Sequence, residues 1–343
     1  MLKELDDELI VVANADCKEV LKSEFKIIKP HCFKNRTLRY LVNAIFTFWL
    51  ILRYRPRLIV VHWASRIWQC LALSLFAKKI IVHTMGGDID GKQDAGGWKK
   101  FFTYLLLRRC KLITVKSEYM KEMLLSNFDK LDKEKIKIIS WGVENRFANH
   151  SKTFTYMDWL ASKKNNRKIF FCIRSMNRFY HKREIVESFL DFKKQTGSDA
   201  ILLISTSNAD PKYMADIIEI VGKTRFVDDI FFAHIPHEFM HEAIHLSDYV
   251  ISYTDTDGLS QSILESMAAC KIVIAKDIPN NAEFIKKDVN GILFENESEL
   301  SGVFAKALNI KYDIEQTKHL SIILDLNLQT RRYIEILKDN FYK

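Results

Sequence analysis

Two carboxylates eight positions apart, Asp257 and Glu265, stand where a strand pattern gives way to a helix pattern. The apolar run YVISY precedes a polar turn that contains Asp257, Gly258, Leu259 and Ser260, and a helix pattern starts directly after it. Gly258 lets the backbone approach a ligand closely, and Ser260 is a favourable N-cap residue. Because the first N–H groups of a helix attract anions, this turn predicts a site suited to a diphosphate.

The spacing of the two carboxylates fits a ligand with a group at each end of such a diphosphate. Glu265 falls more than one turn inside the predicted helix, roughly 6–8 Å along its axis at about 1.5 Å per residue. One carboxylate can then reach a sugar, and the other can reach the hydroxyl groups of a ribose. From these residues alone a simpler interpretation stays open, in which Asp257 caps the helix and Glu265 faces solvent.

The segment resembles the E-x7-E signature of family-4 GT-B glycosyltransferases, whose usual form is E-G-x-x-x-x-x-L-E-A-M-A-x-G-x-P-V-I. It keeps the spacing, Gly258 and the run LESMA at 264–268. It departs from the signature at Asp257, where Glu is usual, and at Cys270 and the positions just after it, where Gly and Pro are usual. The resemblance implies that Glu265 holds the donor ribose, while Asp257 and the amides of the turn bind the transferred sugar.

A basic loop follows the strand pattern at 168–173. It resembles the family's loop that carries an Arg and a Lys onto the donor diphosphate, and the resemblance assigns these roles to Arg174 and Lys182. Arg178 and Arg183 are alternatives, because the loop is longer than usual and lacks the common Gly-Arg pair. Two cations that face a helix N-terminus can neutralise a departing diphosphate, so we expect that the site needs no metal ion and no other cofactor.

The N-terminal half offers a second candidate group, where the strand pattern KKIIVH runs into TMGGD. The family often carries His-Gly-x-Asp or a close variant here, so the resemblance implies that His83 and Asp88 contact the acceptor or the donor sugar.

Another segment departs from the family. The run Leu9–Ala13 is strand-like, yet residues 8–20 contain no glycine. The usual first strand and Gly-rich loop are therefore expected to be missing or replaced.

The sequence also contains a literal zinc motif, H-E-x-x-H, formed by His237 and His241. On one helix, histidines four residues apart can hold zinc while the glutamate acts as a base. However, Pro236 starts only a short helix pattern, and no motif for a third ligand follows. We expect an ordinary surface helix, and a zinc hydrolase remains an alternative function.

Strand-like runs such as Leu58–His62 alternate with helix-like runs such as Pro211–Val221 along the whole chain, which indicates α/β architecture with parallel sheets. With the resemblance, we predict a GT-B fold, in which two Rossmann-like, doubly wound domains face a cleft. The N-terminal, acceptor-side domain is expected at 1–145, and a polar linker at 146–166. The nucleotide-sugar-binding domain is expected at 167–311, and C-terminal helices that pack back across the domains at 312–343.

Charge is spread unevenly over the 343 residues. Residues 1–150 hold 27 Lys and Arg against 16 Asp and Glu, whereas the remainder holds 25 against 27. No acidic residue occurs between Glu24 and Asp88. The N-terminal half is therefore expected to face an anionic partner, and an anionic membrane surface is favoured because no nucleic-acid-binding motif is recognisable.

Two segments bear on this membrane hypothesis. The stretch Leu38–Leu52 is apolar between flanking arginines, but its longest uncharged run, Tyr40–Leu52, is well short of the roughly 20 residues that a spanning helix needs. Trp98–Arg109 combines an apolar face with cations near both ends. For both segments two interpretations stay open, a buried helix and a helix that lies on the bilayer surface.

The sequence thus predicts a metal-independent glycosyltransferase that moves a sugar from a nucleotide-sugar donor to a glycan or lipid-linked acceptor. The resemblance implies retention of configuration and a role in bacterial surface polysaccharide synthesis: capsule, O-antigen or lipooligosaccharide. The N-terminus lacks an apolar signal region and the six cysteines are scattered, so we expect a cytoplasmic protein on the inner face of the membrane. A catalytically impaired nucleotide-sugar-binding subunit and a basic membrane-binding scaffold are alternatives.

Overall fold

The computed structural model describes residues 9–12, 26–27, 36–56, 58–64, 75–90, 97–149, 153–309 and 324–341. The chain forms two compact units, Met1–Ser140 with Gln329–Lys343, and Trp141–Leu328. Each unit contains a six-stranded, wholly parallel sheet with helices packed against it. The predicted class, two parallel-sheet α/β domains, is confirmed. The first unit gives way to the second after Ser140, and the segment expected to be a linker, 146–166, falls inside the second unit.

The sheet of the first unit has the strand order β2-β1-β3-β4-β5-β6. Its strands are β1 (Leu9–Val12), β2 (Lys26–Ile27), β3 (Leu58–His62), β4 (Ile80–His83), β5 (Leu112–Val115) and β6 (Ile136–Ile138). The central strands are runs of β-branched and aliphatic residues buried on both faces, as parallel sheets require. The register places His62 beside His83 at the carboxyl ends of β3 and β4.

A first strand is present, contrary to the expectation that it is missing or replaced. β1 pairs in parallel with β3 from Leu9 to Val12, because a short β-branched run suffices to extend the sheet without any glycine. Residues 13–25, where the Gly-rich loop of the family would stand, lie outside the described residues.

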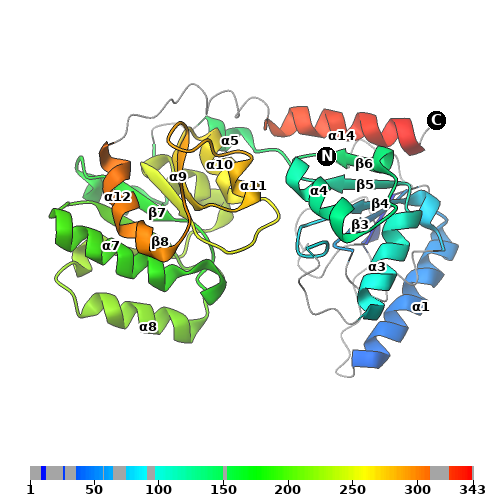
Figure 1. The fold of residues 1–343 in the computed structure, drawn as a ribbon, viewed down its shortest axis with the longest axis horizontal. Helices are drawn as coiled ribbons and strands as arrows, with labels where there is room; N and C mark the ends of the chain where they lie inside the picture. The colour runs from blue at the N-terminus through cyan, green and yellow to red at the C-terminus, as the bar shows by residue number, and fades with distance from the viewer. Residues whose placement is uncertain are drawn as a thin grey trace. The chain divides into compact units, whose positions relative to one another are not determined.

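Helices cover both faces of the first sheet (Figure 1). One face packs against α1 (Arg36–Tyr54), α3 (Gly97–Arg109) and α4 (Glu118–Asn127), and the other against α14 (Leu326–Phe341). Two short 3-10 turns, η2 (Ala77–Lys79) and η3 (Lys133–Lys135), precede β4 and β6. Among the described residues, no helix has the length and apolarity to cross a bilayer.

The sheet of the second unit has the order β12-β11-β10-β7-β8-β9. Its strands are β7 (Ile169–Cys172), β8 (Ile201–Ser205), β9 (Ile230–Ala233), β10 (Tyr249–Ser252), β11 (Ile272–Lys276) and β12 (Gly291–Phe294). The chain winds outward from β7 to β9 and then crosses to β10 on the other side of β7. The strand order therefore reverses between β7 and β10, the place where open α/β sheets bind ligands beyond their carboxyl ends.

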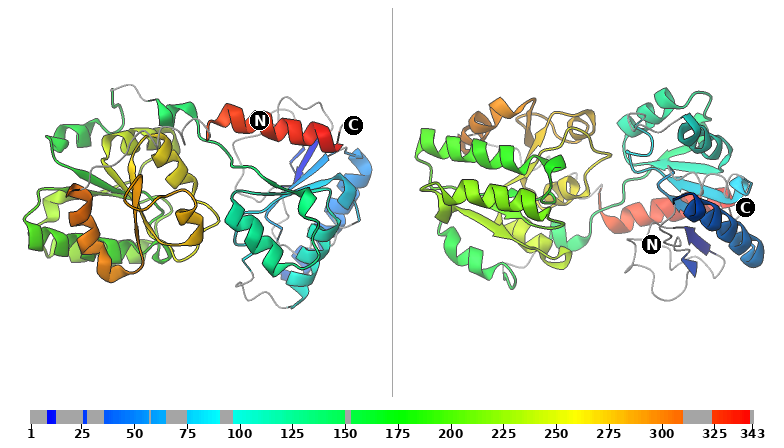
Figure 2. Two further views of the ribbon diagram at one scale, coloured as in Figure 1. Left: turned by 45° about the horizontal axis from the view of Figure 1, so that its top comes forward. Right: turned by 90° about the horizontal axis from the view of Figure 1, so that it is seen from below.

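The helices of the second unit also lie on both faces of its sheet (Figure 2). One face packs against α7 (Lys182–Thr196), α8 (Pro211–Gly222) and α12 (Leu300–Asn309). The other packs against α6 (Asp158–Lys164), α9 (Met240–Leu246) and α10 (Gln261–Ala268). The short elements are α5 (Asn145–Ala148), α11 (Pro279–Ala282), η4 (Arg178–Tyr180), η5 (Val227–Asp229), η6 (His237–Phe239) and η7 (Glu297–Glu299).

Candidate functional site

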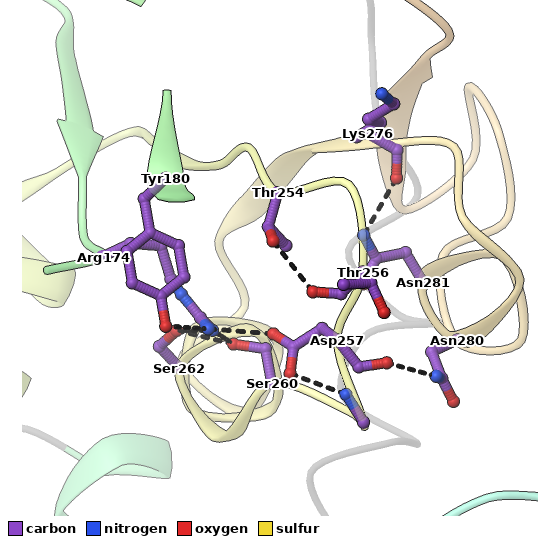
Figure 3. Close-up of polar contacts among 11 residues, drawn as sticks. Arg174, Tyr180, Thr254, Thr256, Asp257, Ser260, Ser262, Lys276, Asn280 and Asn281 are labelled. Carbon is purple, nitrogen blue, oxygen red and sulfur yellow. Dashed lines mark hydrogen bonds and ion pairs between the residues drawn. The ribbon is translucent and has the colours of Figure 1, made fainter. Parts of the chain in front are cut away.

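The sheet of the second unit brings the predicted site residues together at its point of reversal. Arg174 follows β7, and Asp257 lies in the loop between β10 and α10. Because β7 and β10 are parallel neighbours, both residues emerge at the same edge of the sheet. Figure 3 shows Arg174 and Asp257 pointing toward one another beside the first turn of α10.

Arg174 is held by four side chains. Its Nη2 lies 2.9 Å from Asp257 Oδ2 and donates to the Tyr180 hydroxyl at 3.1 Å. Its Nη1 donates to the hydroxyls of Ser260 and Ser262. The guanidinium also lies over the Tyr180 ring, with Cζ 4.5 Å from the ring centroid, in cation–π geometry. The side chains of Arg174 and Asp257 are only 13% and 18% exposed, so this charge pair is largely shielded from solvent.

The loop that carries Asp257 is fixed by its own contacts. Asp257 Oδ1 accepts from the amide of Gly258 at 2.8 Å, and its carbonyl accepts from Asn280 Nδ2 at 2.5 Å. Leu259 has φ +114°, a conformation that is strained for a residue with a Cβ, while its side chain is buried. Such strain costs about 1–3 kcal/mol and persists only where the surroundings enforce it, which occurs most often at functional sites.

Ser260 occupies the N-cap position of α10 as predicted, but its hydroxyl does not cap the helix. The hydroxyl accepts from Arg174 and lies 2.9 Å from Ser262 Oγ. The N-terminal amides of α10 therefore have no side-chain cap, and they lie beside the guanidinium of Arg174. A helix N-terminus and a cation at one place favour an anionic ligand.

The structure places Lys182 differently from the other predicted cations. Its side chain is wholly buried at the start of α7, and Nζ donates to the carbonyl of Cys172 at 2.7 Å. Burial lowers the pKa of this amine. The alternatives are engaged elsewhere: Arg178 lies over the ring of Tyr213, and Arg183 pairs with a glutamate one turn along α7. Of the four basic residues of this loop, Arg174 contacts the Asp257 loop directly.

Glu265 does not face solvent, so that interpretation is wrong. It lies on α10 with its side chain 6% exposed, and Oε1 is 3.7 Å from His237 Nε2. The contact with Glu265 raises the pKa of His237, because the carboxylate stabilises the protonated imidazole. Arg146 approaches the other ring nitrogen at 3.3 Å. Sequence reasoning missed His237 as a neighbour of Glu265, because it comes from a different turn.

The H-E-x-x-H motif is divided between two elements. His237 lies in η6, whereas His241 and His245 lie in α9. Glu242, the residue after His241, is buried and accepts from the amides of residues 155–157, so it anchors the turn that precedes α6. His245 bonds a backbone carbonyl at 2.8 Å. Within the described part of the chain, no three His, Cys, Asp or Glu side chains are placed to share a metal ion.

In the first unit, His83 is buried and contacts two side chains of the protein. Its Nδ1 lies 2.5 Å from Thr114 Oγ1, and its Nε2 lies 2.8 Å from the Tyr333 hydroxyl of α14. Burial lowers the pKa of His83 well below its usual value and keeps the ring neutral. Both ring nitrogens are engaged in this way, so His83 joins α14 to the sheet, and its predicted contact with a sugar stays a prediction. Tyr333 carried no sequence signal for this contact.

Asp88 likewise accepts hydrogen bonds from the protein itself. Its carboxylate accepts from the amides of Met85, Gly86 and Ala64 at 2.8, 3.1 and 2.9 Å. Burial raises the pKa of Asp88, while these amides oppose the shift. The carboxylate therefore fastens its own turn to the end of β3. The predicted contact of Asp88 with a sugar stays a prediction.

Sequence profiles of two families cover most of the chain. The profile of Glycosyl transferases group 1 matches residues 159–320, and that of Glycosyltransferase Family 4 matches residues 1–146. The chain is a family-4-like glycosyltransferase of the GT-B type. The Asp257–Glu265 segment and Arg174 all lie inside the group 1 match.

Three proteins that match this chain are each distant from it in sequence. Glycosyltransferase 1 domain-containing protein 1 from Xenopus tropicalis is 23% identical over 200 residues, which are 57% of this chain and 56% of that protein. The chain thus spans little more than half of that relative. A glycosyltransferase structure from Rickettsia africae aligns with a TM-score of 0.77 and 20% identity, over 97% of this chain and 89% of that one. HepE from Anabaena in complex with UDP aligns with a TM-score of 0.72 and 13% identity, over 92% and 86%. The TM-scores establish a shared fold, and at these identities the likeness extends to the fold alone.

Proposed function

We propose that the protein transfers a sugar from a nucleotide-sugar donor to a glycan or lipid-linked acceptor. The observation that carries this proposal is the juxtaposition of Arg174, Asp257 and the uncapped start of α10 at the point where the strand order reverses. Glu265 adds a buried carboxylate deeper along the same helix. A cation, a helix N-terminus and two separated carboxylates match the parts of a nucleotide sugar.

Each part of the donor has a proposed partner. Arg174 and the first amides of α10 hold the diphosphate, and Lys182 adds positive charge from the start of α7. Glu265 accepts hydrogen bonds from the ribose, and Asp257 with the backbone of Gly258, Leu259 and Ser260 receives the transferred sugar. HepE, which shares the fold, is known in complex with UDP and with UDP-glucose, which supports a nucleotide-sugar donor here.

The donor class can be tested with a thermal-shift panel of UDP-, GDP-, TDP- and CMP-sugars. A ligand that binds only the folded protein at 100 times its Kd adds about 2.7 kcal/mol to the free energy of unfolding, so one member of the panel should raise the melting temperature by several degrees. Turnover of that donor separates an active enzyme from a catalytically impaired binding subunit. A panel without any shift contradicts the proposal.

We further propose that transfer needs no metal ion. Arg174, Lys182 and the N-terminus of α10 supply the positive charge that stabilises the departing diphosphate. Activity should therefore survive excess EDTA. A loss of turnover in EDTA that is restored by Mg²⁺ or Mn²⁺ contradicts this assignment, and stoichiometric zinc in the purified protein would revive the hydrolase alternative.

The surface of the first unit favours a place at an anionic membrane. The outer side of α1 exposes apolar side chains at helical spacing: Leu38, Leu41, Ile45, Phe48, Trp49 and Leu52. Trp98 and Phe101 of α3 are 73% and 53% exposed, and α3 packs on the same face of the sheet as α1. We call these eight residues the apolar surface. The segments Leu38–Leu52 and Trp98–Arg109 therefore belong to helices that are buried on one face and exposed on the other. Such a helix suits a bilayer surface.

These features together support a peripheral enzyme on the inner, cytoplasmic face of the membrane that extends a lipid-linked acceptor. The net positive charge of residues 1–150 supplies attraction to anionic head groups. Retention of configuration and a role in capsule, O-antigen or lipooligosaccharide synthesis are proposed from the family. Product analysis by NMR of the anomeric linkage tests retention directly.

A further inference from the structure

Four side chains surround the guanidinium of Arg174. Nη2 forms an ion pair with Asp257, 2.9 Å from Oδ2, and donates a hydrogen bond to the Tyr180 hydroxyl, while Nη1 donates to Ser260 and Ser262, as Figure 3 shows. Asp257 Oδ2 is buried and has no hydrogen-bond partner among the described residues, so the guanidinium is the group that balances its charge. A phosphate that pairs with this side of Arg174 must therefore take the place of one of the four side chains.

Asp257 is the partner that a phosphate displaces most readily. It is the one of the four that carries negative charge, so its carboxylate and an arriving phosphate repel one another in a largely shielded place. Tyr180 and the two serines are neutral and keep the guanidinium in position. The other carboxylate oxygen of Asp257 stays anchored to the Gly258 amide, so Asp257 needs only a small rotation to release Arg174.

We propose that Asp257 competes with the diphosphate for Arg174, and that this competition makes the site prefer a nucleotide sugar to the bare nucleoside diphosphate. The inference rests on the proposed function. When the donor binds, hydroxyl groups of its sugar donate hydrogen bonds to the carboxylate of Asp257, which no longer pairs with Arg174. After transfer the sugar is gone, Asp257 returns to Arg174, and the diphosphate is bound less tightly. Asp257 is thus a specificity-determining residue that distinguishes donor from product.

The test compares bare diphosphates with the matching nucleotide sugars by calorimetry. Wild type and Asp257→Asn are titrated with UDP, GDP and TDP and with UDP-, GDP- and TDP-sugars. Removing the competing charge should tighten diphosphate binding roughly threefold to tenfold, the range expected for a shielded charge pair. Nucleotide-sugar binding should not tighten, because the sugar loses its acceptor. The affinity ratio of sugar to bare diphosphate therefore falls, and product inhibition strengthens.

Asp255→Asn is the matched control. Asp255 lies in the same loop and is 59% exposed in its side chain, and it pairs with Lys276 at 2.5 Å and with His181 at 3.0 Å. The substitution removes the same charge without touching Arg174, so both affinities should stay at wild-type values. The melting temperatures of both variants report that the fold is intact.

Several outcomes overturn the inference. Unchanged diphosphate affinity in Asp257→Asn means that Asp257 does not compete for Arg174, and weakened affinity means that it positions Arg174 instead. An equal gain in Asp255→Asn means that loop charge alone acts. If wild type binds none of the diphosphates or nucleotide sugars, the proposed function fails and this inference fails with it.

Discussion

Glu265 is the proposed partner of the donor ribose, and its burial bears on how much it would contribute to binding. Its side chain is 6% exposed and has His237 3.7 Å away, so the charge is already desolvated before any ligand binds. A charge-assisted hydrogen bond to a ribose hydroxyl then contributes about 1.5–3 kcal/mol. Glu265→Ala should weaken nucleotide-sugar binding by that amount, measured by calorimetry.

The control for Glu265 is Glu238→Ala. Glu238 is an exposed residue of the neighbouring turn η6. Its substitution removes one negative charge near Glu265 and leaves no cavity in the site. Donor affinity should not change in this variant. Equal affinity in the Glu265→Ala protein and wild type would remove Glu265 from the site.

Cys270 stands where the family signature has glycine, and the backbone shows why glycine is usual there. Its φ is +54°, in the left-handed region that a Cβ disfavours. Glycine relieves this strain but gains entropy in the unfolded chain, so the two effects partly cancel. Cys270→Gly should raise the free energy of unfolding by about 0.5–1 kcal/mol in urea titrations. Cys270→Ala keeps the Cβ and should show no gain, and a gain in both variants would refute the backbone explanation.

At the scale of single residues, the sequence predicted the candidate site residues that lie in a recognisable motif or directly after a strand. The E-x7-E spacing located Asp257 and Glu265, and the strand end located Arg174. It could not predict that Tyr180 stacks on Arg174 or that His237 faces Glu265, because these contacts join separate turns. Nor could the sequence predict the contact between His83 and Tyr333, because the two residues lie 250 positions apart.

At the scale of elements, we expect the packing of β3 against β4 and α14 to make the stability of the protein depend on pH. His62 and His83 lie side by side at the strand ends, with ring centroids 4.9 Å apart. Burial, with Lys116 nearby, lowers the pKa of His62 from 6.5 to about 4. Between these values the unfolded chain binds more protons than the folded protein, so stability is lost as pH falls from 6.5 toward 4.

The pH effect can be isolated with His62→Gln, which cannot titrate. Between pH 7 and pH 5, wild type should lose roughly 1–2 kcal/mol more of its free energy of unfolding than the variant, in urea titrations of both proteins. Because the same pH-dependent change is measured in both proteins, the contributions of other groups whose pKa values shift, such as Asp88 and His237, cancel. Parallel pH curves for the two proteins would show that the neutral His62 ring does not contribute.

Elements with strong local signals were predicted almost to the residue. The predicted strand Leu58–His62 is β3, and the predicted helix Pro211–Val221 is α8, which Asp210 caps and Pro211 begins. The first strand shows the limit of such reasoning. β1 lacks the glycines of the family, and only its pairing with β3 identifies it as part of the sheet.

At the scale of the whole molecule, the excess of positive charge and the apolar surface belong to the same half of the chain. Exposed cations accompany the apolar surface on its own helices: Arg53, Lys100, Arg108 and Arg109. Each cation near an anionic bilayer contributes about 1 kcal/mol, and the attraction decays within a Debye length of about 8–10 Å. The second unit exposes single apolar residues such as Ile218 and Val227, but its share of the sequence has no excess of positive charge.

The protein should therefore bind anionic vesicles reversibly and release them as salt rises. Co-sedimentation with phosphatidylglycerol-containing and with neutral phosphatidylcholine vesicles, at 50 mM and 500 mM salt, measures both dependences. Ile45→Ser combined with Trp49→Ser removes two exposed side chains of α1 and should reduce binding to anionic vesicles about tenfold or more, because each buried apolar side chain contributes about 1.5–3 kcal/mol. Ile218→Ser combined with Val227→Ser makes a comparable change on the second unit and should bind like wild type. Equal binding to both lipids would exclude the cations as the cause, and binding to neither would remove the membrane and its lipid-linked acceptor from the proposed function.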